Sequence, residues 1–189
     1  MHPLLQEIDA APEHVKLYAF NGFAVSWAAE IEYSMFLCFG TAASLPWEEA
    51  VDRFYERVSF SNKRTMAHKA VTAKLAGTPY LARWEALHER IQDLLGEGRS
   101  DRNLVSHNAV HVSIYANGPL EEDETDIRIV QEIRQSPEHI RRGRTERTVS
   151  ATEMRDYCEQ LVRLTLDLNE FLREVLGFGP SHALRRARV

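Results

Sequence analysis

The chain has 189 residues, 44% of them hydrophobic and 27% charged, which is the composition of an ordinary globular protein with one sizeable core. No apolar run reaches the roughly 20 residues that a membrane helix needs, and the first residues lack the order of an export signal, so we expect a cytoplasmic protein without membrane attachment. The formal net charge of −5 equals the charge of the segment EEDETD, residues 121–126, so the rest of the chain is formally neutral.

Apolar residues recur at helical spacing through the first half of the chain, which predicts four helices there. Glycine and proline mark several of their ends. The expected helices span residues 12–39 with Gly40 as the stop, a shorter stretch from Pro46 that buries Trp47, Val51, Phe54, Tyr55 and Val58, a third from a cap at Ser61 to about Ala76, and a fourth from Thr78-Pro79 to Leu95.

The spacing changes to alternation after residue 109, where Val110, Val112 and Ile114 are apolar at every second position. Asn117-Gly118 is a turn signal and a second alternating run follows, so we expect a small β-hairpin with an acidic tip. A final helix is then predicted from the Ser150/Glu153 capping box to Gly177.

The two cysteines, Cys38 and Cys158, lie within apolar helical patterns. Such positions favour buried core thiols over a disulfide or a metal pair.

The junction between the fourth helix and the hairpin, RSDRNLVSHN at residues 99–108, is unusually polar. If residues 102–107 are helical, Arg102, Asn103, Ser106 and His107 share one face, because each residue turns the helix by about 100°. Leu104 and Val105 take the opposite face. The segment is thus able to bury its apolar side and present four polar side chains together.

These residue types suit chemistry on a phosphate ester. Histidine titrates near neutrality and is able to take or give a proton, and arginine offers a charged planar fork to phosphate oxygens. The amide of Asn103, next to the imidazole of His107, is placed to fix its tautomer or to hold a reacting hydroxyl. No metal or other cofactor is required.

The bare pattern Arg-x4-His occurs three times, as Arg83/His88, Arg102/His107 and Arg134/His139. Only the middle copy has asparagine directly after the arginine. Arg83/His88 lies inside the fourth helix and is interpreted as ordinary flanking residues, and Pro137 interrupts the third copy.

RNLVSH, at the end of a bundle helix, resembles the Arg-Asn-x3-His signature of the HEPN superfamily, whose members are small all-α domains and in many cases metal-independent ribonucleases of toxin–antitoxin and antiviral systems. The resemblance covers the helical bundle, roughly residues 12–108 and 150–176. Together with the predicted elements it gives a single, predominantly all-α domain over residues 1–189, a bundle of four to five helices. Residues 110–149 are a β-hairpin insertion that lies outside the minimal bundle of the family, and residues 178–189 are a basic tail. The resemblance also implies that Arg102 and His107 line a cleft at a homodimer interface, with an acidic residue from an earlier helix, for which Glu32 is preferred over Glu30.

Arginines near the junction and in RRGRTER are the other candidates for RNA contact. Clustered arginines also occur simply as solvated surface, and that interpretation stays open. The candidate RNA-binding residues are Arg99, Ser106, Arg141, Arg142 and Arg144.

Two functions from different classes therefore remain. The first is an endoribonuclease that uses Arg102, Asn103 and His107, with RNA as substrate and a possible cognate antitoxin protein as partner. The second is a non-catalytic helical module that binds a partner protein or a nucleotide. Alternatively, the three side chains only complete a helix end. A zinc site at His107 and His111 is disfavoured, because no HExxH glutamate is present.

Overall fold

The computed structural model describes residues 2–96, 110–117, 126–134 and 148–178. The predominantly helical prediction is confirmed over these residues. Their contacts form two compact units, residues 1–26 with 100–160 and residues 27–99 with 161–189. Two long helices, α2 and α8, have residues in both units.

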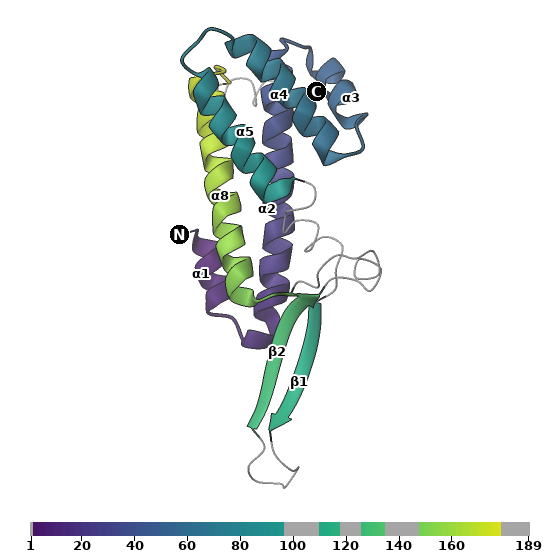
Figure 1. The fold of residues 1–189 in the computed structure, drawn as a ribbon, viewed down its shortest axis with the longest axis vertical. Helices are drawn as coiled ribbons and strands as arrows, with labels where there is room; N and C mark the ends of the chain where they lie inside the picture. Colours follow the sequence, from purple (N-terminus) through teal and green to yellow (C-terminus); the bar gives the residue numbers. More distant parts are fainter. Residues whose placement is uncertain (1, 97–109, 118–125, 135–147, 179–189) are drawn as a thin grey trace, which may run out of the picture. The chain divides into compact units, whose positions relative to one another are not determined.

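Figure 1 shows the described helices and strands, coloured along the sequence. In chain order they are α1 (Pro3–Asp9), α2 (Glu13–Ala42), α3 (Trp47–Tyr55), α4 (Phe60–Leu75), α5 (Leu81–Leu95), β1 (Val110–Asn117), β2 (Asp126–Arg134), β3 (Thr148–Val149) and α8 (Ala151–Glu174).

The first unit is built on α1 and the first halves of α2 and α8. Leu5 of α1 is fully buried, as are Leu17 and Phe20 of α2. Arg155 of α8 donates from Nε to Asp9 Oδ2 at 2.8 Å, which ties the C-terminal helix to the end of α1. Helix α1 was not expected from the sequence, because it is only seven residues long and carries one buried residue, too few to show a helical period.

Strands β1 and β2 belong to the same unit and occupy the interval of alternating sequence. They pair antiparallel, from Val110 opposite Ile133 to Asn117 opposite Asp126. The two-residue strand β3 adds to the other edge of β2 and leads directly into α8.

The second unit packs α3, α4 and α5 with the remaining parts of α2 and α8. Its core is apolar, since the side chains that meet there come from one face of each helix. Fully buried examples are Ile31, Met35, Val71, Trp84, Ile91, Leu164, Leu168 and Phe171.

Gly40 was expected to end α2, and that prediction is wrong, because the helix continues to Ala42. A Cβ added at Gly40 would lie 3.2 Å from Cβ of Ala50 in α3. The glycine therefore lets α2 and α3 approach closely. Beside this contact the ring of Phe36 packs edge-on against Trp47, with centroids 4.8 Å apart.

Two predicted helix starts are also corrected. Ser59, not Ser61, caps α4, and its Oγ accepts from the backbone N–H of Asn62. Helix α5 begins at Leu81 because Thr78 still belongs to the preceding turn, with its Oγ1 donating to the Leu75 carbonyl.

The predicted burial of Val58 is wrong. Helix α3 ends at Tyr55, and Val58 lies in the connection to α4 with 96% of its surface exposed. Tyr55 is itself half-exposed at 45%, so the apolar spacing overstated how far the buried face of α3 extends.

The predicted ends of α8 are confirmed. Ser150 and Glu153 form the capping box, with the Glu153 N–H donating to Ser150 Oγ and the Ser150 N–H donating to Glu153 Oε2. At the other end Gly177 has φ +70°, the left-handed conformation in which glycine commonly ends a helix, and the Phe178 N–H donates to the Leu172 carbonyl.

Replacing Ser150 with alanine is expected to lower the free energy of unfolding by about 1 kcal/mol, because the cap accepts an otherwise unpaired helix N–H. Urea denaturation would measure the change. Ser26→Ala is the matched control, since Ser26 Oγ bonds the Gly22 carbonyl within α2 and caps nothing. Equal effects of the two substitutions would contradict the capping role.

Both cysteines are free and buried, as predicted. Burial raises the pKa of Cys38 far above its ordinary value and raises that of Cys158 to about 12. The Cys158 thiol donates to the Phe20 carbonyl. Both thiols are thus protonated and act as small core residues.

Among the described helices, none combines the length and the apolar character that would be needed to cross a membrane.

Candidate functional site

The motif residues lie between the end of α5 at Leu95 and the start of β1 at Val110. Arg99, Arg102, Asn103, Ser106 and His107 all fall outside the described residues, and so do Arg141, Arg142 and Arg144. Of the predicted site residues, the structure therefore gives the surroundings of Glu32.

Glu32 lies on α2 in the second unit and forms an ion pair with Lys63 of α4. Lys63 Nζ donates to Glu32 Oε1 at 2.6 Å, and the two side chains are only 11% (Lys63) and 21% (Glu32) exposed. Because a half-buried charge is costly without a partner, each of these groups keeps the other in place. Glu30, the alternative acid, is exposed on the same helix.

Lys63 also lies against an aromatic surface. Its ammonium is 4.8 Å from the centre of the Tyr55 ring and 5.8 Å from that of Phe54, in the geometry of a cation–π contact. Burial raises the pKa of the Tyr55 phenol, and the electrostatic influence of Glu32 and then of Tyr33 adds to the effect. The phenol is therefore a poor proton donor near neutral pH, and this cluster links α2, α3 and α4.

The copy of the motif inside α5, Arg83/His88, does not form one site. Arg83 Nη2 donates to Glu170 Oε2 at 2.8 Å, and its Nη1 donates to Glu174 Oε2 at 2.9 Å. The ring of His88 stacks on His68 of α4 instead. The two side chains turn to different neighbours, so Arg-x4-His spacing alone does not bring arginine and histidine together.

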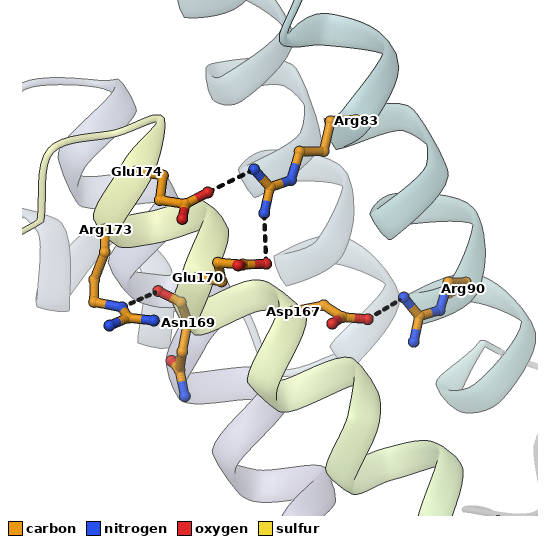
Figure 2. Close-up of polar contacts among 7 residues, drawn as sticks. All are labelled: Arg83, Arg90, Asp167, Asn169, Glu170, Arg173 and Glu174. Atoms are coloured by element: carbon orange, nitrogen blue, oxygen red, sulfur yellow. Dashed lines mark hydrogen bonds and ion pairs between the residues drawn. The ribbon is translucent and has the colours of Figure 1, made fainter.

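Helices α5 and α8 are joined by a row of ion pairs along one exposed side of the second unit. Figure 2 shows the Arg83 guanidinium between Glu170 and Glu174, and Arg90 paired with Asp167 further along the same two helices. Two arginines thus face three carboxylates. These five side chains together carry a formal charge of −1, so the row itself does not favour a polyanion such as RNA.

Replacing Arg83 with glutamine is expected to lower the free energy of unfolding by less than about 1 kcal/mol, because its two ion pairs are solvent-exposed. The loss should shrink further as salt is added, since salt screens exposed charges. Thermal unfolding of both proteins in low and in high sodium chloride measures this. A larger loss that salt leaves unchanged would contradict it.

A group of polar residues that the sequence did not single out lies between α4 and α5. Arg64 and His68 are one turn apart on α4, and Trp84 and His88 are one turn apart on α5. The rings of His68 and His88 stack with centroids 3.8 Å apart at 19°. The i, i+4 spacing within each helix could be read from the sequence. No feature of the sequence near either pair indicated that Arg64/His68 and Trp84/His88 pack against each other.

A cavity of about 240 Å³ lies in the same unit, between the C-terminal part of α2, the start of α3 and the residues after α8. Aromatic and aliphatic side chains line it together with the hydroxyl groups of Thr41 and Ser44. The lining includes Phe36, Leu37, Leu45, Trp47, Leu176 and Phe178.

Within residues 2–96, 110–117, 126–134 and 148–178, no three His, Cys, Asp or Glu side chains are grouped as ligands of one metal ion. Comparison of the chain with models of protein families, with curated proteins and with solved structures finds no match.

Proposed function

We propose that this chain is a HEPN-like, metal-independent endoribonuclease that works in the cytoplasm as a homodimer. The observation that carries the proposal is the segment RNLVSH, in which Arg102, Asn103 and His107 follow an amphipathic helix at a spacing that gives them a common face. The largely helical fold and the position of this segment directly after α5 support the same assignment.

The proposed reaction uses the ribose 2′-hydroxyl of RNA as the nucleophile. His107 takes the hydroxyl proton, the 2′-oxygen attacks phosphorus, and the bond from phosphorus to the 5′-oxygen breaks. The leaving oxygen receives a proton from an imidazolium, for which a second copy of His107 across a two-fold axis is available. The products are a 2′,3′-cyclic phosphate and a free 5′-hydroxyl.

The other residues have supporting roles in this scheme. Arg102 stabilises the charge that develops on the phosphate oxygens, and Asn103 fixes the tautomer of His107. Ser106, Arg99 and the arginines of RRGRTER contact the RNA backbone. Glu32 is the acidic residue of the site, and its ion pair with Lys63 holds its carboxylate in place.

The test is cleavage of an oligoribonucleotide by the purified chain in EDTA. We expect products that end in a cyclic phosphate, and no cleavage of the same sequence in 2′-deoxy form, which lacks the nucleophile. Cleavage that needs a metal ion or that occurs on DNA would overturn the proposal. Absence of cleavage, together with absence of growth inhibition on overexpression, would favour the non-catalytic binding module, whose partner would be an antitoxin protein or a nucleotide.

A further inference from the structure

The residues between α4 and α5 form a built polar cluster, which we call the Arg64 cluster: Arg64, His68, Trp84 and His88. Trp84 Nε1 donates to His68 Nδ1 at 3.2 Å. Because Nδ1 accepts this bond, the proton of the neutral His68 ring is on Nε2, where it is available to a further acceptor. Phe171 of α8 stacks on Trp84 with ring centroids 5.5 Å apart, so the scaffold of the cluster is fixed from three helices.

Arg64 is the unusual member of this cluster. Its Nε and Nη1 atoms are buried, and neither has a hydrogen-bond partner among the residues that the structure describes. In contrast, Arg53, Arg83, Arg90 and Arg155 each have a carboxylate partner. Buried N–H groups of a charged side chain are costly when unpaired, so the two unpaired nitrogens of Arg64 indicate a missing acceptor.

The electrostatics of the cluster agree with a missing anion. The pKa of His88 is lowered to about 4 by burial and by the neighbouring His68 and Arg64, and no carboxylate contributes to the shift. The neighbours on α4 that lower this pKa are thus an imidazole and a guanidinium. At neutral pH His88 is therefore neutral, and no carboxylate of the described residues pairs with Arg64.

We propose that the Arg64 cluster binds a phosphate group. The donors available are the unpaired N–H groups of Arg64, the Nε2–H of His68 and the imidazole of His88, which are more than the two oxygens of a carboxylate would satisfy. A phosphate group presents three or more acceptor oxygens and matches guanidinium geometry. As whole side chains, Arg64, His68 and His88 are partly exposed, so the edge of the cluster faces solvent. Arg64 Nε and Nη1 are covered, so binding requires a side-chain shift that opens these two atoms to the phosphate.

The phosphate is either a free one, as inorganic phosphate or on a nucleotide, or one in the backbone of an RNA chain. Both present the same oxygens to the cluster. None of the four residues takes part in the proposed cleavage reaction. A negative result for phosphate binding at this cluster would therefore leave the proposed RNA cleavage by His107 untouched, and the reverse also holds.

The experiment follows the ring C–H resonances of His68 and His88 by NMR while inorganic phosphate is added to the whole protein, with sodium chloride at equal ionic strength as the reference. We expect both resonances to shift saturably. The pKa of His88 should rise by roughly 1 unit or more, since an anion within hydrogen-bond distance favours the imidazolium. Adenosine 5′-monophosphate and an oligoribonucleotide without terminal phosphates then distinguish the free from the backbone source.

Arg64→Met is the decisive variant, and Lys69→Met, which removes one exposed charge from the same helix, is its matched control. We expect phosphate to bind at least about tenfold more weakly to Arg64→Met and equally well to the control. Without phosphate, Arg64→Met should melt no lower than the wild type, because it removes unpaired buried donors, so the test does not depend on a damaged fold. Failure of phosphate to shift the two histidines, or equal binding by Arg64→Met, would overturn the proposal.

Discussion

Alanine in place of Trp84 is expected to lower the free energy of unfolding by about 3–5 kcal/mol, the usual loss for a large aromatic side chain removed from a core. Trp84 is 0% exposed, stacks on Phe171 and donates its indole N–H to His68. The substitution would leave a cavity between α4, α5 and α8 and an unpaired His68 Nδ1. Chemical denaturation followed by circular dichroism measures the effect.

Trp47→Ala is the control for this prediction, because it removes the same side chain from a half-buried position on α3. Its loss of stability should be clearly smaller. Trp84→Phe keeps an aromatic surface against Phe171 and loses the hydrogen bond, worth about 1 kcal/mol, together with the part of the indole that phenylalanine does not fill. Its loss of stability should therefore lie between those of the wild type and Trp84→Ala. If Trp84→Ala unfolded at the same denaturant concentration as the wild type, the packing described for the second unit would be incorrect.

Replacing His107 with alanine is expected to reduce the rate of RNA cleavage by a factor on the order of 100 to 10,000, because a positioned general base contributes about that much. Arg102→Ala should cause a comparable loss, and Arg102→Lys should restore little of it, since lysine lacks the planar fork. Gel analysis of a 5′-labelled oligoribonucleotide in EDTA measures the rates.

The chain offers its own control for these variants. Arg134 and His139 repeat the spacing of Arg102 and His107 without the asparagine. His139→Ala and Arg134→Ala should therefore cleave at the wild-type rate. Equal cleavage by every variant would identify a contaminating nuclease, and loss of cleavage in His139→Ala alone would show that the wrong copy of the motif was chosen.

The sequence predicted the helices best where their pattern is long or their end signals are local. The Ser150/Glu153 capping box and Gly177 bounded α8 correctly because cap and turn residues act within a few positions of one another. The prediction from Gly40 was wrong because the structural role of this glycine is not local. Its missing side chain makes room for Ala50, ten positions further along the chain, and no spacing rule contains that contact.

The polar sites were less predictable for the same reason. The Arg64 cluster depends on which faces of α4 and α5 meet, and tertiary packing decides that. The partner of Glu32 was equally hidden, because Lys63 is 31 positions away and is buried on a helix with a sparse apolar pattern. The RNLVSH motif could be proposed from the sequence because its residues are neighbours in the chain, and it lies outside the described residues.

Helix α8 has a consequence for how the protein is made. It supplies partners to helices synthesised long before it, through Asp9–Arg155, Phe20–Cys158 and Ser34–Asn169, which join positions 146, 138 and 135 apart. At ribosomal elongation rates, the apolar side of α2 stays exposed for on the order of ten seconds until α8 has been synthesised and packs against it. The nascent chain is therefore exposed to chaperone binding during most of its synthesis. Codon substitutions that slow translation before α8, and leave the amino acids unchanged, should lower the yield of folded protein without altering its final stability.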